Sequence, residues 1–193
     1  NNERWNYFMN QTLNDLINFI RNPKLEKDPN QNPLYKIKIL IHLLWISISI
    51  SFLLSLVNGL FTSLGVLHEN HHIADNFFKD SSGLKILFLA SVLASIAEEL
   101  IFRAPLVLFK QPKLFKIAFY TIGIIFAYVH IFNFEINTNV ILFSPLLVAP
   151  QLFVGFIFGF IRIRLGLIWS ICLHGLYNGL LVSSFLIATN GNS

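Results

Sequence analysis

Three charged residues interrupt an apolar stretch that is long enough to cross a bilayer. Residues 84–109 are almost entirely hydrophobic, yet Glu98, Glu99 and Arg103 stand in the second half of this stretch. A charged side chain at the centre of a bilayer costs about 2.5–3.5 kcal/mol on insertion scales, so such residues persist where they face a protein interior and find partners. The three residues therefore predict a buried polar site within a membrane protein.

The composition is typical of a helical membrane protein. Of the 193 residues, 54% are hydrophobic and only 12% are charged, which is too apolar for a soluble domain of this length. The net charge of +4 is small, and its distribution indicates orientation in a membrane rather than a nucleic-acid partner. The single cysteine, Cys172, excludes an internal disulfide framework and a zinc–thiolate cluster.

Five hydrophobic runs predict membrane-spanning helices, because only helices and closed barrels satisfy all their backbone groups in lipid. The runs cover residues 37–67, 84–109, 114–134, 140–161 and 165–188. Pro145 and Pro150 predict kinks in the fourth run. The expected fold is an all-α, polytopic transmembrane bundle of about five spans.

The segment before the first run carries apolar residues at helical spacing over residues 2–21. This pattern predicts an amphipathic helix, which either lies at the membrane interface or packs on the membrane domain. We therefore divide the chain into a cytoplasmic or interfacial segment, residues 1–35, and a transmembrane domain, residues 36–190, whose motif core spans residues 84–185.

Lysine and arginine are unevenly distributed among the connections. They are frequent before the first run, between the second and third runs and between the fourth and fifth, whereas the connection from the third run to the fourth and the C-terminal tail contain none. This alternation predicts a cytoplasmic N-terminus and an outer C-terminus. We expect a multi-pass protein of a bacterial cytoplasmic membrane.

Polar residues recur inside three of the runs, and a spacing of four places two of them on one helix face. They are Glu98, Glu99 and Arg103 in the second run, His130 in the third, and His174 and Asn178 in the fifth. At a rise of about 1.5 Å per residue, the expected topology brings these groups to one layer near the middle of the membrane. The sequence therefore predicts that they form one site.

Such side chains have the chemistry needed to add water to an amide. A carboxylate that is shielded from bulk water can take a proton from a water molecule, and a neutral histidine can orient that water. A second histidine and an asparagine can donate hydrogen bonds to an oxyanion. Two histidines and one glutamate could equally bind a zinc ion with an open position.

The motifs EExxxR, FxxxH and HxxxN occur in this order on successive hydrophobic runs. The identity and order of these motifs resemble those of the CPBP intramembrane protease family. This family includes the type II CAAX prenyl endopeptidases and the bacterial Abi or bacteriocin-immunity proteins. The resemblance covers about residues 84–185. It implies that Glu98 is the general base, that His130 helps it to activate water, and that His174 and Asn178 stabilise the oxyanion.

The resemblance also implies supporting roles for Glu99 and Arg103, which would hold the helix and tune Glu98. The alternative is that this pair is only a structural ion pair. The family is often described as metalloproteases, in which case Glu98, His130 and His174 would hold zinc. Because the sequence offers no dedicated third histidine or cysteine ligand, we favour a metal-free site.

The sequence therefore predicts an intramembrane endopeptidase that hydrolyses a peptide bond of a membrane-associated protein or peptide, with membrane lipid as its surroundings. One alternative is a proton-coupled transporter, because intramembrane glutamate and histidine also build proton relays. Another is a non-catalytic membrane scaffold or immunity protein that keeps the fold and does not cleave.

A second pattern, residues 68–72, reads His-Glu-Asn-His-His and matches the zinc-protease motif HExxH. That chemistry needs both histidines on one face of a stable helix. Here the match falls in a short polar connection between two hydrophobic runs. We expect a solvated loop there rather than a zinc site.

Overall fold

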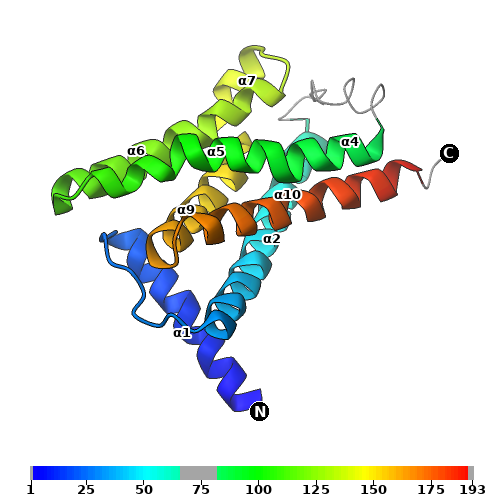
Figure 1. Ribbon diagram of the computed structural model, residues 1–193. Coiled ribbons are helices and arrows are strands. Elements are labelled where there is room, and N and C mark those ends of the chain that lie inside the picture. The colour runs from blue at the N-terminus through cyan, green and yellow to red at the C-terminus, as the bar shows by residue number, and fades with distance from the viewer. Residues whose placement is uncertain (1, 66–81, 191–193) are drawn as a thin grey trace.

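All regular elements of the chain are helical in the computed structural model, which describes residues 2–65 and 82–190 (Figure 1). The α-helices are α1 (Asn2–Arg21), α2 (Pro33–Ser63), α4 (Gly83–Phe88), α5 (Ser95–Phe102), α6 (Pro112–Val129), α7 (Thr138–Leu142), α8 (Ser144–Leu147), α9 (Ala149–Arg164) and α10 (Leu167–Asn190). A π-helical segment, η1 (Leu89–Ala94), joins α4 to α5, and short 3-10 segments, η2 (Ala104–Leu108) and η3 (His130–Asn133), follow α5 and α6. The expected all-α class is confirmed.

The central element of the bundle is α9. It packs against α1, α2, α6 and α10, and Figure 1 shows these helices around it. Val154, Ile157, Phe158 and Ile161 are each no more than 2% exposed. A helix that is apolar on several faces needs neighbours on those faces, so the composition of α9 accounts for its central position.

Three helical segments are long and apolar enough to cross a membrane. They are Pro33–Ser63, Pro112–Asn133 and Leu167–Ala188, and they correspond to the first, third and fifth hydrophobic runs. The second and fourth runs are divided into shorter helices. Three such segments in one chain identify a multi-pass membrane protein.

The fourth run differs from the kinked helix that its prolines predict. Pro145 and Pro150 lie in the first turns of α8 and α9, after breaks at Phe143 and Val148. In the first turn of a helix the missing N–H of proline breaks no hydrogen bond. The two prolines therefore begin new helices instead of bending a continuous one.

The N-terminal helix packs on the membrane domain through one face. Thr12, Leu16 and Phe19 are buried against the domain, whereas Leu13 and Ile17 are 39% and 37% exposed. Figure 1 shows α1 along the side of the bundle on which α2, α6 and α10 begin. The structure shows the packing alternative for α1, and part of the other face stays apolar and uncovered.

Two glycines of α10 permit its close approach to the second run. A Cβ atom at Gly175 would lie 2.6 Å from the carbonyl oxygen of Ser91 in η1, whereas a Cβ atom at Gly179 would lie 3.5 Å from the Ser91 Cβ. Small residues four apart let the backbones of membrane helices come together. The contact fixes the position of α10 and of the polar residues that it carries.

We predict that Gly175→Ala lowers the free energy of unfolding by about 1–3 kcal/mol, because the added methyl group meets a backbone atom that no side-chain rotation can move. Gly179→Ala is the matched control on the same helix face, since its methyl group would make an ordinary contact. Thermal unfolding in detergent measures both variants. Equal unfolding temperatures for the two would contradict this account of the packing.

Candidate active site

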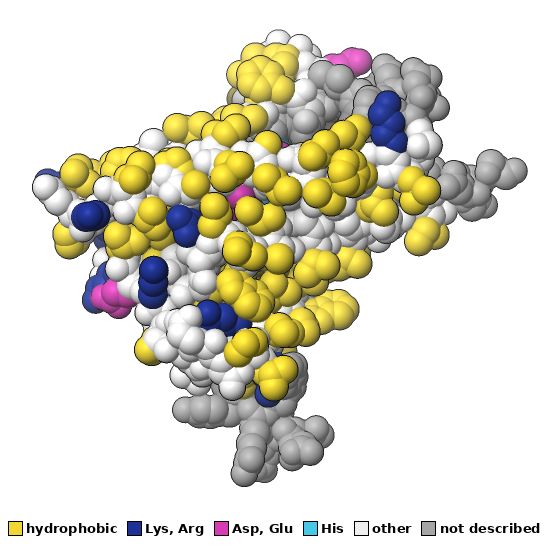
Figure 2. All heavy atoms as spheres, in the orientation of Figure 1, with side chains coloured by type: hydrophobic (Ala, Val, Ile, Leu, Met, Phe, Trp, Pro, Cys, Tyr) yellow, Lys and Arg dark blue, Asp and Glu magenta, His cyan; other side chains and the backbone are white. Residues whose placement is uncertain are grey.

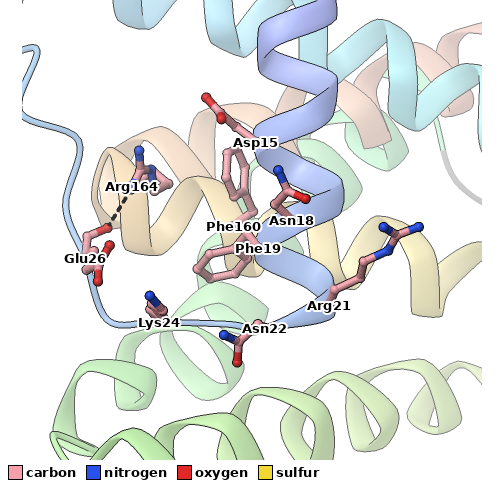
Figure 3. Close-up of a pocket in the computed structure, with 9 residues that line it drawn as sticks. All are labelled: Asp15, Asn18, Phe19, Arg21, Asn22, Lys24, Glu26, Phe160 and Arg164. Carbon is pink, nitrogen blue, oxygen red and sulfur yellow. Dashed lines mark hydrogen bonds between the residues drawn. The ribbon is translucent and has the colours of Figure 1, made fainter.

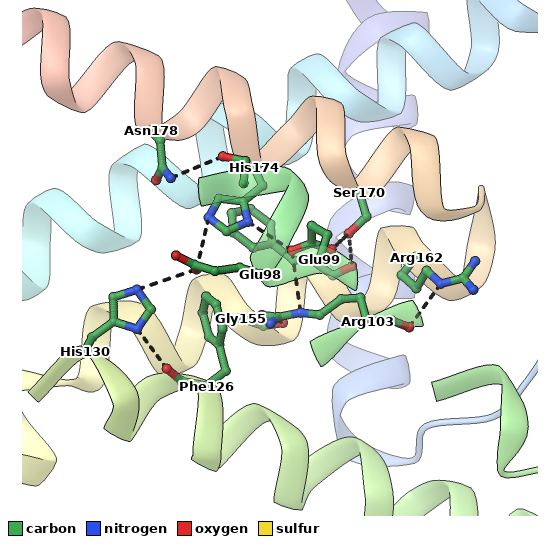
Figure 4. Close-up of polar contacts among 12 residues, drawn as sticks. Glu98, Glu99, Arg103, Phe126, His130, Gly155, Arg162, Ser170, His174 and Asn178 are labelled. Atoms are coloured by element: carbon green, nitrogen blue, oxygen red, sulfur yellow. Dashed lines mark hydrogen bonds and ion pairs between the residues drawn. The ribbon is translucent and has the colours of Figure 1, made fainter. Parts of the chain in front are cut away.

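Glu98 of α5 faces histidines from two other helices. Its Oε2 lies 3.8 Å from Nε2 of His130, where α6 passes into η3, and 3.7 Å from Nε2 of His174 on α10 (Figure 4). This oxygen is buried and has no hydrogen-bond partner among the described residues. The structure thus brings together three of the candidate residues from three separate hydrophobic runs.

The other nitrogen of each histidine ring is already bonded. His130 Nδ1 lies 2.8 Å from the carbonyl oxygen of Phe126, and His174 Nδ1 lies 3.0 Å from Oε1 of Glu99. A carbonyl oxygen and an ionised carboxylate only accept, so both Nδ1 atoms donate, and in the neutral rings both Nε2 atoms are acceptors. In that state Glu98 Oε2 and the two Nε2 atoms are three hydrogen-bond acceptors that face one another without a donor. A water molecule between them would supply two hydrogens for these acceptors.

The exposed part of the site lies at Glu98 and His130. The side chains of Glu98 and His130 are 28% and 22% exposed, whereas that of His174 is 3% exposed. The His174 ring stacks on Phe158 of α9, with ring centroids 4.4 Å apart. A substrate can therefore approach from the side of Glu98 and His130, and the central helix α9 closes the opposite side.

Glu99 points away from this opening into the protein. It is fully buried, accepts hydrogen bonds from His174 and from the Ser170 hydroxyl, and lies 3.7 Å from Nε of Arg103. An ionised carboxylate survives burial only when charged and hydrogen-bonded partners replace water. These partners belong to α5 and α10, so Glu99 joins the two helices and orients the ring of His174.

Arg103 ends α5 and is only 1% exposed. Its Nη2 donates to the carbonyl oxygen of Gly155, and its guanidinium carbon lies 3.7 Å from the centroid of the Phe126 ring. A Cβ atom at Gly155 would lie 2.8 Å from Phe126 and 3.1 Å from Arg103 Nη2. The cation–π contact between Arg103 and Phe126 therefore needs a glycine at position 155 of α9. This contact also holds Phe126 in place, and the carbonyl oxygen of Phe126 orients the ring of His130.

Asn178 lies beside the site, and its amide group is engaged with the second run. Its Nδ2 lies 3.2 Å from the carbonyl oxygen of Ala90 and 3.3 Å from Oγ of Ser95. Ala90 is in the π-helical segment η1, where the altered hydrogen-bond pattern makes a carbonyl oxygen accessible to a side chain. In this structure Asn178 joins α10 to the second run, and both of its amide hydrogens have partners.

Two residues of this network were not singled out by their sequence. Ser170 supplies the second hydrogen bond to Glu99, and Phe158 covers the ring of His174. Ser170 stands four residues before His174, so its position on the same helix face was a signal in the sequence. For Phe158, one of many phenylalanines in an apolar helix, the sequence carried no such signal.

Among the described residues, no group of three or more His, Cys, Asp or Glu is placed to hold a metal ion. The distances of 3.7 and 3.8 Å around Glu98 exceed the separation of about 3.3 Å between ligand atoms of tetrahedral zinc. The HExxH pattern at residues 68–72 lies outside the described residues.

The fold and the site define a multi-pass helical membrane protein with a carboxylate and two imidazoles gathered in a partly enclosed space. A family model, type II CAAX prenyl endopeptidase Rce1-like, matches residues 80–180. The chain belongs to this family of CAAX-type intramembrane proteases, and the resemblance of its three motifs is confirmed. Comparisons with curated proteins and with solved structures give no match.

We predict that two neighbouring isosteric substitutions differ in their effect on stability. Glu99→Gln is expected to lower the free energy of unfolding by about 3–5 kcal/mol, because Arg103 then stays buried without its counter-charge. Glu98→Gln is expected to leave the unfolding temperature close to that of the wild type, because Glu98 Oε2 makes no hydrogen bond that would be lost. Thermal unfolding in detergent compares them. The interpretation of Glu99 fails if both variants unfold like the wild type.

Proposed function

We propose that this chain is an intramembrane endopeptidase that uses Glu98 to activate water against a peptide bond of a membrane-associated protein or peptide. The observation that carries the proposal is the convergence of Glu98 Oε2 with Nε2 of His130 and Nε2 of His174, at 3.8 and 3.7 Å. This arrangement binds a hydrogen donor and leaves a carboxylate ready to accept its proton. The membership in a protease family supports the same reaction.

In the proposed reaction, Glu98 takes a proton from the water while the water oxygen attacks the carbonyl carbon. His130 accepts the second hydrogen bond of the water and so fixes its direction. When the tetrahedral intermediate collapses, the C–N bond breaks and the proton held by Glu98 passes to the leaving amine. Acid and base roles thus fall to one carboxylate in sequence.

The oxyanion of the tetrahedral intermediate needs hydrogen-bond donors. His174 can donate from Nε2 when its ring carries both protons, and the Glu99 carboxylate on Nδ1 is the counter-charge for that form. Asn178 is the second proposed donor. For this role one of its amide hydrogens would leave Ser95 Oγ, the more distant of its two partners at 3.3 Å.

We also propose that the second and fourth runs cross the membrane although each is divided into shorter helices. The segments α4, η1, α5 and η2 follow one another without a long connection, which supports a second span. On this topology the chain has five spans, a cytoplasmic N-terminus, an interfacial segment at residues 1–35 and a protease domain at residues 36–190.

We predict that Glu98→Gln reduces cleavage by about 10²–10⁴-fold, because the amide cannot accept the proton of the water. Purified protein in detergent with a panel of membrane-tethered peptides measures this loss. Glu135→Gln, which changes an exposed glutamate outside the site, is the matched control and should cleave like the wild type. Equal cleavage by the Glu98 variant, or ion flux in liposomes with no cleavage by any form, would contradict the proposal.

We further propose that the reaction needs no metal ion, because the acceptors around Glu98 stand too far apart for a metal shell. Dialysis of the purified protein against a chelator should leave the cleavage rate unchanged, and elemental analysis should find much less than one zinc per chain. This part of the proposal is wrong if the protein holds one zinc per chain, if removal of the zinc abolishes cleavage, and if added zinc restores it.

A further inference from the structure

A second candidate site lies between the end of α1, the loop that follows it and the last turns of α9. A cavity of about 420 Å³ opens there (Figure 3). Its floor consists of Phe19 and Phe160, whose ring centroids lie 5.3 Å apart. Nothing in the proposed cleavage reaction uses this cavity.

The walls of the cavity are held in place by hydrogen bonds to the rest of the fold. The Tyr120 hydroxyl of α6 lies 2.7 Å from the carbonyl oxygen of Ile20 and so fixes the last turn of α1. The backbone N–H of Asp28 donates to the carbonyl oxygen of Arg164 at 2.9 Å, and the Asp28 carboxylate accepts from the Tyr35 hydroxyl. The loop is therefore tied to α2 and α9, and the cavity is a built feature of the fold.

Basic side chains from three segments border this cavity. Arg21 ends α1, Lys24 lies on the loop and Arg164 ends α9, whereas Asp15 and Glu26 supply two carboxylates. Figure 3 shows Lys24 and Arg164 on one side of the two phenylalanine rings and Arg21 on the other. Figure 2 shows further Lys and Arg side chains gathered over the part of the molecule where α6 begins and α9 ends. The wider surroundings are thus basic, although within the cavity Arg164 is already paired, because its guanidinium lies 3.8 Å from the Asp28 carboxylate and donates to the carbonyl oxygen of Glu26.

An uncovered apolar side chain stands next to these cations. Leu25, between Lys24 and Glu26 in the loop, is 37% exposed, and the rings of Phe19 and Phe160 line the cavity itself. A ligand that places a phosphate among the cations would therefore meet uncovered apolar surface with its other end. Free phosphate would use the cations alone, whereas a phospholipid would use both.

We propose that this cavity binds the phosphate-bearing headgroup of a membrane phospholipid. Lys24 contacts the phosphate, Arg21 closes the opposite rim, and Arg164, held by Asp28 and the Glu26 carbonyl oxygen, borders the headgroup. Basic pockets at the ends of membrane helices are suited to such headgroups, because each basic side chain near the surface adds electrostatic attraction. The bound headgroup would fix α1 and α9 at the level of the membrane surface.

The test measures retention of lipid by the full-length protein in detergent, using native mass spectrometry with short-chain phosphatidylglycerol as the probe. We expect the Arg21→Gln/Lys24→Gln double variant to bind this probe about tenfold or more weakly than the wild type. The Lys27→Gln/Lys38→Gln double variant loses the same charge from exposed residues that do not line the cavity, and it should bind like the wild type. Circular dichroism checks that both variants keep their helices.

Two further probes separate the sources of the phosphate. A diacylglycerol with the same acyl chains lacks the phosphate and should not be retained, whereas glycerophosphate lacks the acyl chains and should not displace the lipid. Equal binding by the two double variants, retention of diacylglycerol, or displacement by glycerophosphate would each overturn the proposal. Because the readout is lipid retention, its outcome is independent of cleavage by the Glu98 site.

Discussion

The buried ion pair of Glu99 and Arg103 is the interaction on which the rest of the site depends. Removing two charges from water costs several kcal/mol for each ion, so the pair survives burial only with further partners around it. Glu99 obtains its partners from α10, through Ser170 and His174, and Arg103 obtains its partners from α9 and α6, through the Gly155 carbonyl oxygen and the Phe126 ring. One pair of charges on a single helix thereby fixes three neighbouring helices.

The same pair explains why two adjacent glutamates have different surroundings. Successive residues on an α-helix point about 100° apart, so Glu98 and Glu99 cannot share one environment. Glu99 points into the protein and is neutralised there, whereas Glu98 Oε2 faces the two histidines and lacks a hydrogen-bond partner among the described residues. The histidines link the two, because His174 donates to Glu99 from one nitrogen and faces Glu98 with the other. The structural pair thus orients the ring of His174 for the chemistry that we propose at Glu98.

The sequence predicted those parts of the molecule that local spacing determines. The bounds of α1, the helical character of the runs and the membership in the family follow from periodicity and from motifs with a spacing of four. The partners across helices did not follow, because the sequence does not state which faces of two helices meet. The contact of Asn178 with Ala90 depends on a π-helical segment, and the contact of Arg103 with Phe126 depends on a missing side chain at Gly155. Both contacts are consequences of tertiary packing. The division of the fourth run into separate helices is another feature that the sequence did not predict.

The central helix relates the two sites to each other. Gly155 stands beside Arg103 in the catalytic network, and Arg164 borders the basic cavity nine residues later on α9. At about 1.5 Å per residue these positions are about 13 Å apart along the helix axis. If the cavity holds a lipid headgroup, Arg164 marks the membrane surface, and the catalytic network lies about 13 Å below it. The apolar part of a bilayer is about 30 Å thick, so on the proposed topology, with α9 upright, Gly155 and its neighbour Arg103 would lie close to the middle of the membrane.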